Sequence, residues 1–73
     1  MMISGAKDAT LTQVRLVDIH GTLYYDLTYT HADDTTPRSA RVGKDDIYPD
    51  PHPGDSVRIR YVMNVVTEIQ HAS

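Results

Sequence analysis

The residues best suited to binding chemistry are arginines. Four of them, Arg38, Arg41, Arg58 and Arg60, stand in the second half of the chain. A guanidinium group presents a planar fork of N–H donors that matches a phosphate or a carboxylate. Arginine beside an exposed aromatic ring also holds single-stranded nucleic acid, and Tyr24 offers such a ring. We therefore predict Arg41, Arg58, Arg60 and Tyr24 as binding residues.

Catalytic chemistry finds little support in the chain. Nucleophilic catalysis needs a nucleophile beside a base, and neither Ser39 nor Ser56 has a histidine at a suggestive spacing. The four glycines are isolated, so no phosphate-binding glycine loop is formed, and there is no cysteine. We predict a protein that is not an enzyme, with no catalytic residues, no cofactor and no small-molecule substrate.

The histidines and aspartates do not form a metal-binding pattern. No two histidines stand at ligand spacing, and we expect all four to be solvated: His20, His31, His52 and His71. The acidic residues around His52 lack the alternating carboxylates and the final glutamate of a calcium loop. We expect them to make turns and cap a helical turn, and we predict no metal site: Asp45, Asp46, Asp50 and Asp55.

Charge and length restrict the class of protein. A net charge of −3 argues against a strong, nonspecific nucleic-acid binder. No apolar run approaches the roughly 20 residues of a membrane span, and the first residues lack a basic segment followed by an apolar one. Seventy-three residues make one domain with a small core. We expect a cytoplasmic protein of bacterial type that does not bind membranes.

The elements that must position these side chains are strands. The chain has one glutamate, two lysines and five tyrosines, and it is rich in valine, isoleucine and threonine. Such a composition suits pleated, half-buried surfaces rather than exposed helices. Alternation and turn residues predict five strands, at residues 9–19, 22–31, 38–42, 56–62 and 65–70. Residues 1–8 are predicted to be a flexible arm, 9–70 the domain and 71–73 a tail.

The residues also predict a register. A two-residue turn at His20-Gly21 places apolar side chains together on one face and opposite charges together on the other. The last hairpin is expected to have a three-residue loop. The pairs predicted are Leu16 with Tyr25, Val14 with Leu27, Thr12 with Tyr29, Arg15 with Asp26, Val17 with Tyr24, Ile59 with Ile69 and Arg60 with Glu68.

The first strand changes its buried face along its length. Val14 and Leu16 are on one face, whereas Val17 and Ile19 are on the other. This predicts a bent strand shared between two sheets, with a bulge near residues 16–18.

Three strands, a long connection and a hairpin are the order of the oligonucleotide/oligosaccharide-binding (OB) barrel. The connection has room for a helical turn over residues 44–48, capped by Asp45, with Ile47 and Tyr48 plugging the barrel. We predict an all-β fold, a small five-stranded antiparallel barrel of OB-like type. The alternatives are another small, SH3-like barrel or open sheets.

The most consistent function is a non-catalytic binding module. A small core favours association, and Val17, Ile19, Tyr24, Val62 and Val66 are expected to form an outward apolar patch. We therefore predict protein–protein interaction or self-association as a homo-oligomer. The alternative is single-stranded nucleic-acid (oligonucleotide) binding through the arginines and Tyr24. For that, Arg41, Arg58 and Arg60 must form one stripe.

Overall fold

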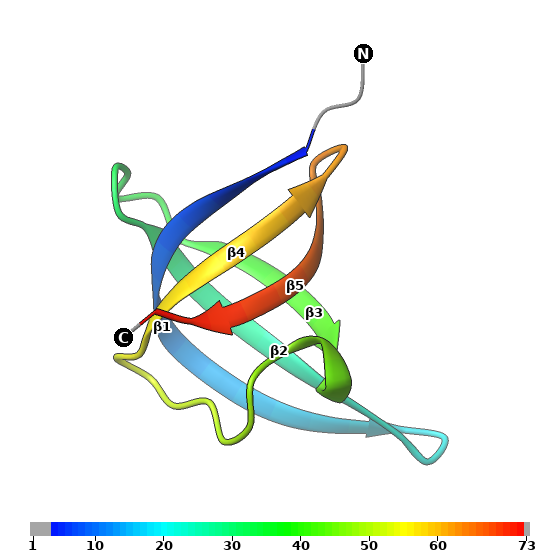
Figure 1. Cartoon of the computed structure of the whole chain (residues 1–73). Coiled ribbons are helices and arrows are strands. Elements are labelled where there is room, and N and C mark those ends of the chain that lie inside the picture. The colour runs from blue at the N-terminus through cyan, green and yellow to red at the C-terminus, as the bar shows by residue number, and fades with distance from the viewer. Residues whose placement is uncertain (1–3, 73) are drawn as a thin grey trace.

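The structure, a computed structural model, describes residues 4–72 as one antiparallel sheet with the strand order β3-β2-β1-β4-β5 (Figure 1). The predicted all-β class is confirmed. A single turn of 3-10 helix, η1, follows β3. The strands are β1 (Ser4–Ile19), β2 (Thr22–His31), β3 (Arg38–Gly43), β4 (Ser56–Val62) and β5 (Val65–His71), and η1 is Lys44–Asp46.

The long first strand belongs to two ladders. β1 pairs with β4 from Ser4 to Thr10 and with β2 from Ala9 to Ile19. The prediction of a strand shared between two sheets is wrong in this respect, because both ladders belong to one sheet. Residues 4–8 differ from the expected arm because their backbone is hydrogen-bonded to β4, and His71 likewise belongs to β5. Residues 1–3 and 73 of the predicted arm and tail lie outside the described residues.

The β1–β2 hairpin has the predicted turn and register. His20 and Gly21 both have positive φ, 52° and 85°, as a two-residue hairpin of the favoured hand requires. The pairs Leu16–Tyr25, Val14–Leu27, Arg15–Asp26 and Val17–Tyr24 are confirmed. The hairpin extends beyond the core, so Leu16 is 52% exposed.

The bulge in β1 lies between Leu11 and Gln13, and the predicted position at residues 16–18 is wrong. Tyr29 therefore pairs with Leu11 and not with Thr12. The cause lies on the other edge of β1, where pairing with β4 ends at Thr10. There the N–H of Leu11 donates to the carbonyl of Asp55 at 2.9 Å, and the carbonyl of Leu11 accepts from Gly54 at 2.7 Å. The bulge lets β1 leave β4 and meet this loop.

The β4–β5 hairpin confirms the pairs Ile59–Ile69 and Arg60–Glu68 but not the three-residue loop. Its turn is two residues long, with φ of 51° at Met63 and 67° at Asn64. The register shifts between Arg60 and Tyr61. This bulge, rather than a longer loop, brings Ile59 opposite Ile69 and Arg60 opposite Glu68.

The core lies on the concave face of the sheet. Ile47 is buried and forms an isolated bridge with Ile69, and Tyr48 packs against the core. The plugging of a barrel by these two residues stays a prediction. The predicted cap is wrong: Gly43 occupies the N-cap position of η1 and no side chain caps it. The buried residues of the hydrophobic core cluster are Ala9, Leu11, Leu27, Tyr29, Val42, Ile47, Val57, Ile59 and Ile69.

The sheet is not closed. Within residues 4–72, β3 forms a ladder only with β2, and β5 forms one only with β4. β3 and β5 approach each other without a shared ladder. No helix in this part of the chain is long and apolar enough to cross a membrane.

Candidate functional site

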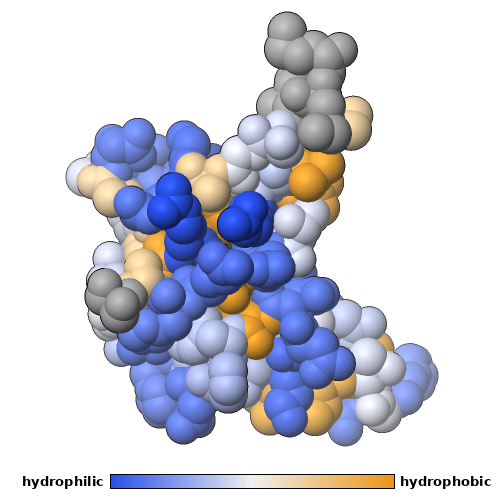
Figure 2. Space-filling view, viewed as in Figure 1, coloured by the Kyte–Doolittle hydropathy of each residue, from blue (hydrophilic) through white to orange (hydrophobic). Residues whose placement is uncertain are grey.

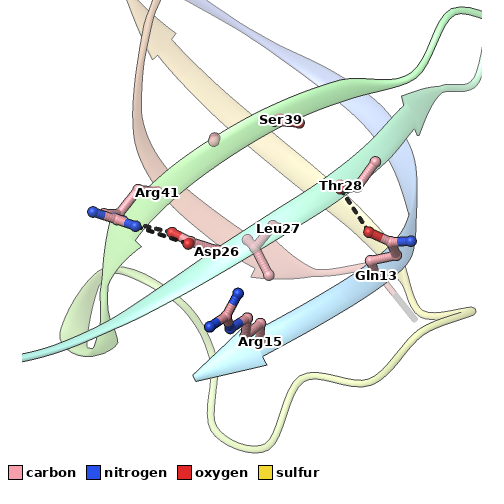
Figure 3. Close-up of a pocket in the computed structure, with 8 residues that line it drawn as sticks. Gln13, Arg15, Asp26, Leu27, Thr28, Ser39 and Arg41 are labelled. Carbon is pink, nitrogen blue, oxygen red and sulfur yellow. Dashed lines mark hydrogen bonds and ion pairs between the residues drawn. The ribbon is translucent and has the colours of Figure 1, made fainter. Parts of the chain in front are cut away.

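Two of the predicted binding residues lie on the convex face of β2 and β3. The Arg41 guanidinium donates two hydrogen bonds to the Asp26 carboxylate, from Nε to Oδ1 at 2.6 Å and from Nη2 to Oδ2 at 2.8 Å (Figure 3). This pairing lowers the pKa of Asp26 and raises that of Arg41. Tyr24 stands two residues before Asp26 on the same face, opposite Gly43. Arg41 therefore already has an anionic partner within the chain.

The other two predicted binding residues lie on β4. Arg58 and Arg60 alternate with the buried Val57 and Ile59, so both point to the convex face and are exposed. The most hydrophilic atoms in the view of Figure 2 gather over this strand. In the sheet, β1 and β2 separate β4 from β3. The structure thus brings Arg58 near Arg60 and Arg41 near Tyr24, as two groups on different strands.

A groove opens where β3 and β5 fail to pair. Its volume is about 790 Å³. We call it the concave groove. Among the residues that line it are Lys7 of β1, Tyr29 and His31 of β2, Arg38 and Arg41 of β3, Tyr61 of β4, and Val65 and Val66 of β5.

The register turns two cationic side chains toward the concave groove. Lys7 pairs with Ile59, and Arg38 pairs with Tyr29. Directly opposed residues of an antiparallel pair project from the same face, and Ile59 and Tyr29 are both buried in the core. Lys7 and Arg38 therefore share the concave face with the core, although both are exposed at its open end.

A hydrogen-bonded chain of three rings forms the floor of the concave groove. The hydroxyl of Tyr61 lies 2.8 Å from Nε2 of His31 and 3.1 Å from the hydroxyl of Tyr29. With neutral His31, Tyr29 can donate to Tyr61 and Tyr61 to Nε2. With protonated His31, Nε2 donates and both hydroxyl bonds reverse. Both hydrogen bonds among the three rings can therefore form in either protonation state of His31.

The surroundings of His31 favour its neutral form. Burial lowers the pKa of His31, and the positive charges of Arg38 and Lys7 lower it further, against the weaker opposing effects of Asp33 and Asp34. Burial also raises the pKa of Tyr29, so this phenol stays protonated as a donor. Of the two cations, Arg38 has an exposed ion pair with Asp34 at 3.4 Å. Lys7 forms no ion pair within residues 4–72.

Apolar side chains flank the concave groove at the β4–β5 turn. Val62, Met63 and Val65 are 40%, 71% and 63% exposed, and Figure 2 shows hydrophobic surface at the end where β1 begins and β4 turns into β5. The predicted apolar patch is divided. Its members Val17, Ile19 and Tyr24 lie at the β1–β2 turn, and Val62 and Val66 lie at the opposite end of β1.

The aspartate-rich connection is held by a structural hydrogen-bond cluster. The Tyr48 hydroxyl donates to Oδ2 of Asp55 at 2.7 Å, and the backbone N–H of His52 donates to the same oxygen at 2.9 Å. The His52 N–H, and then the Tyr48 hydroxyl, lower the pKa of Asp55. Among residues 4–72, no three His, Asp or Glu side chains are grouped closely enough to hold a metal ion.

Sequence reasoning missed the concave groove although signals for it were present. His31 continues the alternation of Leu27 and Tyr29 on the buried face of β2, yet it was expected to be solvated. It is 6% exposed. Lys7 was expected to lie in a flexible arm. The alternation that puts Ala9 and Leu11 on the buried face of β1 was therefore not extended to Lys7. Comparison of this chain with protein-family models, curated proteins and solved structures found no match.

Proposed function

We propose that this chain is a non-catalytic binding module that takes an extended segment of a protein partner into the concave groove. The observation that carries the proposal is the gap in the sheet. The edges of β3 and of the first half of β5 have no ladder partner within residues 4–72, and the concave groove lies between them. An exposed sheet edge is a template for an added strand, with backbone hydrogen bonds giving affinity and pockets giving specificity.

Strand direction supports the same mode of binding. Every neighbouring pair in the sheet is antiparallel, so the two outermost strands, β3 and β5, run in the same direction. One incoming strand antiparallel to β3 is therefore antiparallel to β5 as well. Beyond this groove, Ile47 bridges to Ile69 and narrows the opening, so we infer that the bound segment is short.

We infer that the sheet is a partly open barrel of OB-like type. The strand order β3-β2-β1-β4-β5 supports this assignment, because joining its two ends gives the cyclic order of that barrel. The approach of β3 to β5 and the buried Ile47 after η1 support it further.

The chemistry of the concave groove favours a protein partner. His31 bonds to a phenol, and among the described residues no serine or threonine hydroxyl bonds to it as a nucleophile would. Exposed Val62, Met63 and Val65 beside the groove suit an apolar side chain better than a phosphate backbone. Arg58 and Arg60, the best candidates for phosphate contacts, lie on the other face of β4.

Site-specific photocrosslinking in cells of the source organism tests the proposal. A photoreactive phenylalanine analogue replaces Val65 at the rim of the concave groove, and in a matched control it replaces Leu16 at the far hairpin. The two positions are similarly exposed, at 63% and 52%. We expect a discrete crosslinked protein from position 65 that is absent from position 16.

Three results would overturn the proposal. Equal capture from both positions would show that the groove is not the binding surface. A nuclease-sensitive product from position 65 would assign the groove to nucleic acid. No product from position 65, in cells where the protein is expressed, would leave the groove without a partner. A crosslinked dimer would identify the partner as a second copy of the chain.

A further inference from the structure

We propose that Lys7, Arg38 and His31 form a subsite for the carboxylate of an acidic side chain in the bound segment, and that binding is accompanied by protonation of His31. This inference rests on the proposed function, since it specifies which segment the concave groove takes. It commits to an extended protein segment bearing Asp or Glu.

Charge complementarity is the first argument. Lys7 and Arg38 project from the concave face, where other positions of the sheet present the apolar Ala9, Leu27 and Ile59. An inward cation at the open end of a sheet discourages nonspecific strand pairing, and it also selects a strand that brings a compensating charge. Side chains of an added strand alternate between its two faces, so one of them can project toward Lys7 and Arg38 while its neighbours point outward.

The ring chain on the floor supplies the second argument. The charged and titratable groups around His31 are Lys7 on β1, Tyr29 on β2, Asp33 and Asp34 in the following loop, Arg38 on β3 and Tyr61 on β4. β5 contributes the apolar Val66. Without a ligand, the two cations oppose a proton on His31. A bound carboxylate offsets them, and the Tyr61 and Tyr29 hydroxyls reverse to accommodate the proton.

The expected linkage has a definite sign. Because the complex holds the proton on His31 more strongly than the free protein does, affinity must increase as pH falls. The carboxylate of the ligand stays ionised above about pH 5, so the range from pH 8 to pH 6 isolates the histidine. A ligand without a carboxylate has no reason to show this dependence.

The test uses the full chain and two blocked strand peptides, acetyl-Thr-Val-Glu-Val-Thr-amide and its glutamine counterpart. NMR titration follows the backbone amides and the His31 ring. We expect the glutamate peptide to bind in the concave groove about fivefold or more tightly at pH 6 than at pH 8, and the glutamine peptide to bind weakly at both. His31→Gln should remove the pH dependence, and His20→Gln, at the far turn, should keep it.

Matched variants test the cations. Lys7→Gln and Arg38→Gln should each reduce the preference for glutamate, whereas Lys44→Gln on η1 should not. In the free protein, both groove variants should also move the His31 titration to higher pH. Amide spectra report whether each variant stays folded.

The outcomes separate the two proposals. Equal binding of both peptides in the concave groove would overturn the carboxylate subsite and leave the proposed function standing. Failure of the glutamate peptide to bind at millimolar concentration would also overturn the subsite, while crosslinking from position 65 still decides the function. A deoxythymidine oligonucleotide that occupied the concave groove more tightly than the glutamate peptide would replace the acidic segment as the ligand.

Discussion

Lys7 lies directly opposite Ile59 in the β1–β4 ladder, so a cationic side chain shares a face with one of the fully buried residues of the core. We expect Lys7→Val to stabilise the protein by about 0.5–1 kcal/mol, because a β-branched apolar residue suits a concave strand position better than a lysine. Urea unfolding followed by circular dichroism measures the change. Lys44→Val, outside the sheet, should give no gain, and a loss at position 7 would contradict our interpretation of the concave face.

Tyr61→Phe removes the hydroxyl that joins Tyr29 to His31. Tyr29 and His31 are both buried, so each loses a hydrogen bond to Tyr61 that no other group replaces. We expect a loss of about 1–3 kcal/mol in the free energy of unfolding. Tyr25→Phe is the matched control, because the Tyr25 hydroxyl has no hydrogen-bond partner among the described residues, and its stability should change little. Equal effects at the two positions would argue against the ring chain.

Mild acid should destabilise the free protein through His31. The folded state holds the pKa of His31 below its ordinary value of 6.5, so the unfolded chain binds more protons as pH falls through that value. The free energy of unfolding should therefore be highest above about pH 6.5 and should decrease from there toward pH 5. The aspartates with lowered pKa values, such as Asp34 and Asp55, lose their contribution only at lower pH. Thermal unfolding at a series of pH values should show a shallower decline for His31→Gln than for the unmodified chain.

The turn between β4 and β5 places a methionine in a left-handed conformation. Met63 has a φ of 51°, which asparagine adopts more readily than methionine does. We expect Met63→Asn to stabilise the protein by about 0.5–1 kcal/mol, measured by chemical denaturation. Met63→Ala retains a Cβ without the compensating side-chain hydrogen bonds and should give no comparable gain. An unchanged or lower stability for the asparagine variant would count against a strained turn.

The sequence was most informative where local chemistry decides the structure. Alternation gave the bounds of β2 and β4, and the His20-Gly21 turn gave the register of Leu16 with Tyr25. The bulge at Leu11 could not be placed in the same way, because it depends on hydrogen bonds from Gly54 and Asp55, which are remote in the chain.

The candidate site was predictable only in part for a related reason. The exposure of Arg58 and Arg60 follows from alternation along one strand. The groove depends instead on how far β3 stays from β5, which no local pattern encodes. Lys7 was misassigned because its partner Ile59 is 52 residues away in the chain.

The division of β1 between two ladders has a consequence for the order of folding. β1, β2 and β3 follow one another along the chain, and so do β4 and β5, so each group can assemble through contacts between near neighbours in sequence. Joining the groups requires β1 to pair with β4, for example Thr10 with Ser56. Such a non-local pairing is slow, because the entropy cost of closing a long loop comes before any stabilising contact forms. The floor of the concave groove joins Tyr29 and His31 of one group to Tyr61 of the other, so we expect it to form only when the two groups come together.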